Sequence, residues 1–173
     1  MRLKVITIAI ATALFLATSA CSKQPERTYK DSVKTALEQA DLKDVSVSED
    51  ADKNTITLGG TLHSDDAKQR AADVAKANAG ARVVANEISV EPVGQESQAK
   101  SVESNLDDGI ENNYKAALVA KGLDKQHIRF DAKNGVLTLK GKVKNPTLRK
   151  EAEQLAQAVP NVQQVVNQID VSR

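Results

Sequence analysis

The sequence predicts an α+β protein made of two small modules, each with the order helix, strand, strand, helix, strand and a mixed three-stranded sheet packed against two helices. Apolar residues at every second position mark two strands, Thr55–Leu62 and Val136–Val143, as buried on one face. Each of these strands contains a glycine, at position 60 in the first and 141 in the second, so the two copies are offset by 81 residues. At this offset the two halves of the chain align without a gap from Tyr29 to Val90 of the first half. The aromatic content of 2% suits two small cores of Ala, Val and Leu better than one large core.

Residues 1–20 have the features of an export signal peptide. Arg2 and Lys4 form a basic start, and the apolar run from Val5 to Leu16 is too short to span a bilayer comfortably. A small-residue cleavage region ends the segment at Ala20. We therefore expect the chain to be exported.

The only cysteine of the chain, Cys21, follows this segment directly. The run from Thr18 to Cys21 resembles the lipobox of bacterial lipoproteins, although leucine is usual where Thr18 stands. The resemblance implies that Cys21 becomes the acylated N-terminus, which would anchor the protein on a membrane rather than through it. The alternative is ordinary cleavage after Ala20, which would leave a free thiol in an oxidising compartment.

Residues 21–28 are predicted to form a lipidated polar tether. Fully extended, the seven residues from Ser22 to Thr28 span about 25 Å at most, so we expect the first module close to the lipid surface. Ser22 stands where the inner-membrane retention rule of enterobacterial lipoproteins has aspartate. That part of the resemblance implies the outer membrane, on its periplasmic side.

The local signals follow the same order in both copies. An apolar face predicts the first helix, with Tyr29, Val33, Ala36 and Leu37 in one copy and Ile110, Tyr114, Ala117 and Leu118 in the other. A strand near Val45–Glu49 or His127–Phe130 leads through a turn into the alternating strand. A second helix, capped by Ser64 or Asn145, then crosses to a last, parallel strand.

A glycine, Gly60 or Gly141, takes the place of an apolar residue in the buried row of each alternating strand. A missing side chain at such a position marks a bulge or a place where another backbone packs close. We expect a helix to lie across each glycine.

The last strand of each copy has the pattern Val-x-Asn-x-Ile-x-Val, at Val84–Val90 and Val165–Val171. Together with Gly60, Gly141 and a module length of about sixty residues, this pattern resembles the BON domain (bacterial OsmY and nodulation). The resemblance covers essentially everything after the tether. It implies a periplasmic or outer-membrane protein of a family thought to bind phospholipid surfaces and often linked to osmotic or envelope stress.

Residues 29–91 and 107–173 are therefore assigned to a first and a second BON domain. Between them, residues 92–106 contain Pro92, Gly94 and many Ser, Gln and Glu residues, so their composition predicts a linker that is helical towards its end. Its length permits the modules to move relative to each other. The sequence leaves open whether they dock.

Asn86 and Asn167 share the parity of the core-facing residues in the last strands. Because buried amides must be paired, we expect these side chains to bond backbone groups near a bulge or a helix end and not to bind a ligand. With Gly60 and Gly141 they form the structural signature of the module.

Charge separates the two copies. Asp31–Val90 contains seven Lys or Arg against eleven Asp or Glu, a net charge of −4, whereas Asn112–Val171 contains ten against five, a net charge of +5. The net charge of the whole chain, +1, gives no indication of a nucleic-acid partner.

The second copy carries basic residues on the outer face of its sheet. Lys140 and Lys142 stand where the first copy has Gly59 and Thr61, and they alternate out of phase with the core-facing residues. We predict contact with anionic lipid headgroups, each basic residue contributing about 1 kcal/mol, through Arg129, Lys140, Lys142 and Lys144. The alternatives are a solvated face, or a surface docked on the acidic first module.

The sequence contains no arrangement typical of catalysis or metal binding. His63 and His127 occupy non-equivalent positions, one before a helix cap and one on a predicted strand. Asp50–Asn54 begins like a calcium loop, but Thr55 and Thr61 stand where glycine and a bidentate glutamate belong. We expect no enzyme activity, no metal and no cofactor.

Two classes of function remain. The first is a membrane-surface binding lipoprotein that supports envelope integrity under osmotic or envelope stress. The second is a periplasmic protein-interaction or chaperone-like stress protein that recognises an envelope protein partner, with lipid serving only as the anchor.

Overall fold

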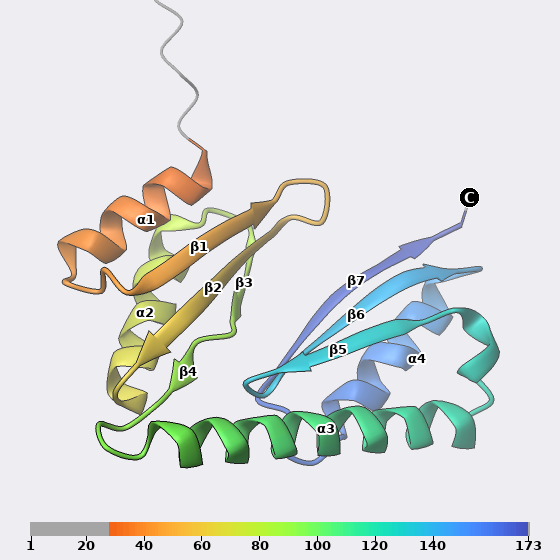
Figure 1. Cartoon of the computed structure of the whole chain (residues 1–173). Helices are drawn as coiled ribbons and strands as arrows, with labels where there is room; N and C mark the ends of the chain where they lie inside the picture. Colours follow the sequence, from red (N-terminus) through yellow and green to blue (C-terminus); the bar gives the residue numbers. More distant parts are fainter. Residues whose placement is uncertain (1–27, 173) are drawn as a thin grey trace, which may run out of the picture.

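Each half of the chain folds into one module in the computed structural model, which describes residues 28–172 (Figure 1). The first module contains α1 (Tyr29–Gln39), β1 (Val45–Asp50), β2 (Thr55–Leu62), α2 (Asp65–Asn78), β3 (Val83–Asn86) and β4 (Ser89–Val90). The second contains α3 (Glu96–Ala120), the 3-10 helix η1 (Asp124–Gln126), β5 (Arg129–Lys133), β6 (Val136–Val143), α4 (Pro146–Gln157) and β7 (Gln164–Val171). The predicted α+β class with two small modules is confirmed.

β2 and β6 are the central strands of the two sheets. β2 pairs antiparallel with β1 and parallel with β3 and β4, and β6 pairs antiparallel with β5 and parallel with β7. The crossover helices α2 and α4 begin at the predicted caps, since the side chains of Ser64 and Asn145 accept the backbone N–H groups of Ala67 and Leu148 at 3.2 and 2.9 Å. Each parallel pairing therefore follows a strand, helix, strand crossover.

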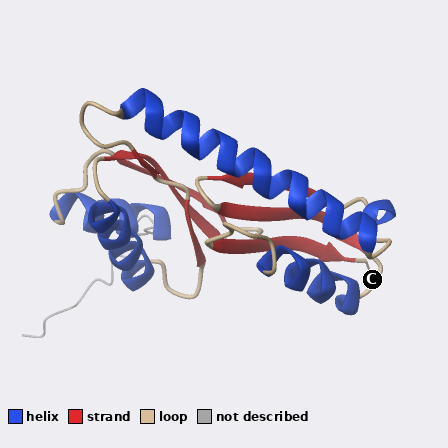
Figure 2. Cartoon of the chain, turned by 90° about the horizontal axis from the view of Figure 1, so that it is seen from below, coloured by secondary structure: helices blue, strands red, loops and turns tan. Residues whose placement is uncertain are grey.

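Each core lies between a sheet and the helices packed on one of its faces (Figure 2). In the second core the buried Tyr114 hydroxyl donates a hydrogen bond to the Ala152 carbonyl at 3.1 Å, and burial raises the pKa of Tyr114. The main core residues are Val33, Leu37, Ile56, Leu58, Ala71 and Ala75 in the first module and Ile110, Tyr114, Leu137, Leu139, Ala152 and Ala156 in the second.

The two hairpins differ in a way that the ungapped alignment conceals. Ser46 lies opposite Gly59, whereas Arg129 lies opposite Lys140. The central strands are thus offset by 81 residues, from 59 to 140, but the first strands by 83, from 46 to 129. The second module has two more residues before its first strand, where η1 lies, and a turn that is two residues shorter. The expected gapless alignment is wrong over β1 and β5.

Gly60 and Gly141 lie beside the backbone that leads into the first strand of each module. Their φ angles are +105° and +121°, and a Cβ atom at either position would collide with a backbone carbonyl oxygen, that of Asp44 or His127. Both carbonyls belong to the segment just before the first strand of the module. A close backbone approach, one of the two options, is therefore present, but the expectation of a helix across the glycine was wrong.

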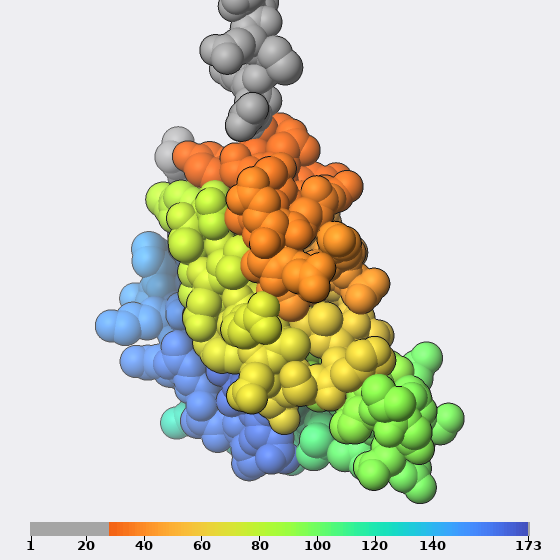
Figure 3. Space-filling view, turned by 90° about the vertical axis from the view of Figure 1, so that its left-hand side faces the viewer, coloured from red at the N-terminus to blue at the C-terminus, as the bar shows by residue number. Residues whose placement is uncertain are grey.

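The segment predicted as a linker, residues 92–106, is mostly helical. α3 begins at Glu96 and continues without a break into the second module as its first helix. In Figure 3 the green residues around the start of α3 form a lobe beside the first module. The structure corrects the expectation of a linker with helix only towards its end.

Carboxylates four residues apart on α3 bind backbone groups of both modules. Because i and i+4 lie on one helix face, they form a row along the side that meets the two sheets. The bonds are Glu103 to the Val90 N–H at 2.9 Å, Asp107 to the N–H groups of Asn134 and Gly135 at 2.7 and 3.0 Å, and Glu111 to the Ala132 N–H at 2.9 Å. α3 thus connects the end of β4 with the β5–β6 hairpin.

The two modules also dock through the faces of their sheets that carry no helices. Ala85, Val136 and Val166, one from each of β3, β6 and β7, form a buried cluster between the sheets. Next to it the Gln164 side chain donates to the Val84 carbonyl at 2.6 Å and accepts the Asn86 N–H at 3.3 Å. These contacts answer the question that the sequence left open.

Candidate anion-binding surface

The β5–β6 hairpin places Arg129 and Lys140 side by side on the outer face of the second sheet. The two residues are direct partners across the strands, and both are exposed. Leu139 and Val143 of β6 point to the core, so the alternation of the strand sends Lys140 and Lys142 to the opposite face. The predicted outward orientation of this row agrees with the structure.

Docking divides this outer face into a covered half and an open half. Val136 and Thr138, at the start of β6, are 2% and 7% exposed, and Val136 packs against Ala85 of the first module. Lys140 and Lys142, further along the same strand, are exposed. Lys144 is also exposed, but it follows the end of β6 and lies in the turn before α4. The start of β6 is therefore covered, whereas the predicted basic residues are exposed.

A cleft of about 480 Å³ lies between the open half and the first module. Every residue that lines it is polar, charged or glycine: Ser48, Asp50, Lys53, Thr57, Arg129, Lys140, Gly141, Gln168 and Asp170. β1, β2 and the turn between them form one wall, and β5, β6 and β7 form the other. Of the four predicted basic residues, the structure brings Arg129 and Lys140 into the cleft and leaves Lys142 and Lys144 outside its lining.

Two of the lining residues form an ion pair that joins the two walls of the cleft. The Lys53 ammonium lies 2.7 Å from the Asp170 carboxylate and joins the turn of the first module to β7. The pKa of Asp170 is lowered, chiefly by this hydrogen bond and further by the nearby charges of Lys53, Lys142 and Arg149. By contrast, among the described residues neither Arg129 nor Lys140 forms an ion pair.

The two signature asparagines make equivalent bonds in the two modules. Asn86 donates to the Lys68 carbonyl at 3.2 Å, and Asn167 donates to the Arg149 carbonyl at 3.4 Å, in each case to the crossover helix. Each side-chain oxygen accepts the backbone N–H two residues further along, at 3.4 Å from Ile88 and at 3.1 Å from Ile169. The amides thus connect the last strand to the helix, and no ligand is needed to pair them.

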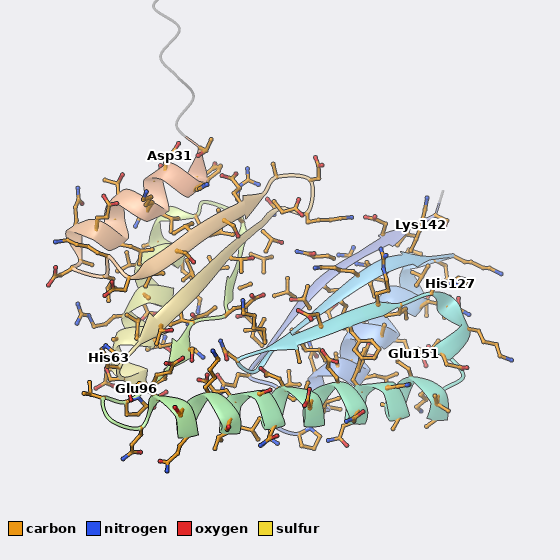
Figure 4. The ribbon with its side chains drawn as sticks, in the orientation of Figure 1. Asp31, His63, Glu96, His127, Lys142 and Glu151 are labelled. Carbon is orange, nitrogen blue, oxygen red and sulfur yellow. The ribbon has the colours of Figure 1, made fainter. Side chains whose placement is uncertain are left out.

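The remaining predicted positions do not join the cleft. Cys21 lies outside the described residues. His63 is exposed and its Nδ1 lies 2.8 Å from the Glu91 carbonyl, near the label of Glu96 in Figure 4. His127 was predicted to lie on a strand, and this prediction was wrong. The residue instead ends η1, with a left-handed φ of 56°. The extra residues before β5 displace it from the strand.

Sequence reasoning missed the first-module wall of the cleft and the acidic row on α3. The row had a detectable signal, because Glu103, Asp107 and Glu111 repeat every four residues as on one helix face. The pairing of Lys53 with Asp170 had none, because it joins residues far apart in the sequence through the docking of two modules.

Residues 28–172 lack two further kinds of functional feature. This part of the chain contains no group of three or more His, Cys, Asp or Glu side chains that could hold a metal ion. It also contains no helix that is both long enough and apolar enough to cross a bilayer.

Comparison with known families decides the identity of the modules. Residues 26–92 and 106–173 both match the BON domain. The chain belongs to the BON domain family. The internal repeat is therefore a pair of BON modules, which confirms the family resemblance drawn from the glycines and the last strands.

Named proteins with similarity to this tandem BON chain include the osmotically-inducible protein Y of Escherichia coli (strain K12). It is 29% identical over 139 residues, which cover 79% of this chain and 68% of the relative. Among solved structures, the C-terminal domain of CdsD, a structural protein of the type III secretion system of Chlamydia trachomatis, has a TM-score of 0.33 and 16% identity. That match covers 80% of this chain and 62% of the other, less than two thirds of its length, and supports no functional inference.

Proposed function

We propose that this tandem BON protein is a non-enzymatic lipoprotein of the cell envelope that binds phospholipid surfaces through its second module and supports the envelope under osmotic stress. The support for the stress role is the similarity to an osmotically inducible protein. The support for the envelope is the signal-peptide pattern of residues 1–20 with Cys21 directly after it.

The observation that carries the membrane proposal is the open half of the outer face. Arg129, Lys140, Lys142 and Lys144 are all exposed, while the covered half of the same face is occupied by the first module. A basic residue near an anionic leaflet contributes about 1 kcal/mol of binding free energy. Four such residues in one region give a useful affinity without any enclosed pocket.

The position of the expected anchor is compatible with this surface. In Figure 4 Asp31, at the start of α1, and Lys142 both lie on the upper side, whereas α3 runs along the opposite edge. A chain held near its first helix would therefore be able to turn Lys142 towards the membrane that holds it.

Co-sedimentation with vesicles tests the proposal. The sample is residues 22–173, which contain both modules and lack Cys21, and the vesicles contain phosphatidylglycerol and phosphatidylcholine. Replacing Lys140, Lys142 and Lys144 by glutamate should weaken binding about a hundredfold or more, because three favourable contacts of about 1 kcal/mol each are lost. Equal binding by the wild-type and variant chains would remove the basic surface from the proposal.

A charge-matched control distinguishes the effect of this surface on vesicle binding from the effect of the net charge of the protein. Lys34, Lys115 and Lys121 are exposed, lie on α1 or at the end of α3, and form no ion pair among the described residues. Their replacement by glutamate changes the net charge by the same amount and should leave most of the vesicle binding intact.

The lipid anchor has its own test. Mass spectrometry of the mature N-terminus should find diacylated Cys21, and membrane fractionation should then place the protein in the outer membrane. An unmodified N-terminus would remove the anchor and leave a periplasmic protein.

Protein interaction is the second candidate function, and one observation favours it. Val102 and Leu106, one turn apart on α3, are 56% and 44% exposed. Leu106 also borders a cavity of about 380 Å³ between α3 and both modules. Crosslinking in cells from position 102 should recover one defined envelope protein if this surface binds a partner.

A further inference from the structure

Two cations lie side by side on one wall of the cleft between the modules. Arg129 and Lys140 are direct cross-strand partners, and like charges in such a pair destabilise a sheet. Both side chains are exposed, both line the cleft, and neither has an ion-pair partner among residues 28–172. Among the described residues, no carboxylate therefore lies in direct ion-pair contact with either cation.

The fold does not require this pair. In the first module the structurally equivalent residues are Ser46 and Gly59, which are partners in the same register. The same pairing therefore also forms with two small, neutral residues at these positions. An anion between the two cations is a physical reason for having Arg129 and Lys140 in the second module.

The other groups of the cleft suit a compact anion with several oxygen atoms. Lys53 and Asp170 neutralise each other at 2.7 Å. Ser48 and Thr57 on the opposite wall provide hydroxyl donors. Asp50 is the remaining carboxylate of the lining, and one of its oxygens accepts the Lys53 backbone N–H at 3.0 Å. Arg129 and Lys140 thus outnumber the single carboxylate that is not in an ion pair.

We propose that Arg129 and Lys140 bind a phosphate group in the cleft between the modules. The guanidinium offers paired donors that match two phosphate oxygens, and the ammonium adds a point charge beside them. The cleft of about 480 Å³ has room for one lipid headgroup or one soluble phosphate ester. The inference rests on the proposed function only where the phosphate comes from a lipid.

The first measurement uses soluble probes. The chain of residues 22–173 is titrated with inorganic phosphate and with glycerol 3-phosphate at constant ionic strength, and the backbone amides are followed by NMR. Saturable shifts should appear at Arg129, Lys140 and Ser48, on both walls of the cleft. Shifts spread over all lysines without saturation would overturn a defined site.

Paired variants assign the binding to the two cations. Arg129→Gln with Lys140→Gln should weaken phosphate binding by about tenfold for each charge-assisted contact that is lost. Lys115→Gln with Lys121→Gln removes the same charge from α3 and should change the affinity less than about twofold, since surface charges at this distance are screened. Equal losses in the two variants would contradict the proposal.

A gain of affinity is expected on the opposite wall. Asp50→Asn removes the carboxylate that faces the bound anion, so phosphate should bind several-fold more tightly at low ionic strength. Unchanged or weaker binding would place the anion away from this cleft.

Vesicle binding by the same variants identifies the source of the phosphate. If glycerol 3-phosphate binds in the cleft and Arg129→Gln with Lys140→Gln leaves vesicle binding unchanged, the ligand is a soluble phosphate ester. If the variant loses vesicle binding and no soluble probe binds, the ligand is a lipid headgroup. If neither binding depends on Arg129 and Lys140, the site does not exist, while the wider basic surface is still tested by Lys142 and Lys144.

Discussion

The two modules have one fold and opposite surfaces. The glycine on the central strand and the asparagine on the last strand make equivalent contacts in both. The outer face differs, because Ser46 and Gly59 of the first module correspond to Arg129 and Lys140 of the second. The comparison teaches that the shared face specifies the module, whereas the face that is not shared distinguishes the two copies.

The largest loss of stability should come from replacing the glycines that the two modules share. Gly60→Ala and Gly141→Ala each place a Cβ atom against a backbone carbonyl at a positive φ, and each should lower the free energy of unfolding by about 3 kcal/mol. Thermal unfolding followed by circular dichroism measures the loss. If only one of the two substitutions destabilises the protein, the glycines do not have the same role.

The shared asparagines should give the next largest effect. Asn86→Ala and Asn167→Ala each remove the bonds between the last strand and the crossover helix and should cost about 2 kcal/mol. Chemical denaturation of the two variants gives the comparison directly. A neutral result in either module would mean that water replaces the amide there.

A substitution on the outer face of the second sheet, which the two modules do not share, should raise the stability of the protein instead of lowering it. Lys140→Thr removes one member of a like-charge cross-strand pair and should raise the free energy of unfolding by about 0.5 kcal/mol in the absence of phosphate. The change should shrink as salt screens the repulsion. A destabilised variant at low salt would show that Lys140 has a favourable partner.

The smallest effect concerns the contact between the modules. Because the Lys53 ammonium lowers the pKa of Asp170, the pair stabilises the folded protein above the ordinary carboxyl pKa of 3.8, and this contribution is lost as the pH falls through the lowered value. Asp170→Asn should therefore be slightly less stable than the wild type at pH 7 and equal to it in strong acid. A difference that persists in acid would assign the effect to packing.

Much of each module could be predicted from the sequence, because its signals are local. The alternation of β2 and β6 and the caps Ser64 and Asn145 depend on neighbouring residues only. The different offset of the first strands, 83 residues instead of 81, was missed. The second module has two extra residues before β5 and a turn that is two residues shorter, so the two length differences cancel and an ungapped alignment does not show them.

The sequence left the docking of the modules open, although residues of the contact were visible in it. Val136 and Val166 are apolar at outward positions of their strands, which indicates a covered outer face. The helical start of α3 was hidden by Pro92, Gly94 and several Ser residues, a composition typical of a linker. The carboxylates of Glu103 and Asp107 on this helix bind backbone groups of both modules, and these contacts are not visible in the sequence.

One measurement tests directly whether the unshared face of the second module carries the function. Lys140→Thr with Lys142→Thr makes this face resemble that of the first module without reversing any charge. Binding to phosphatidylglycerol vesicles should fall about thirtyfold, from two lost contacts of about 1 kcal/mol each, while the thermal stability stays the same or rises. Vesicle binding equal to that of the wild type, in a variant that is fully folded, would contradict the account.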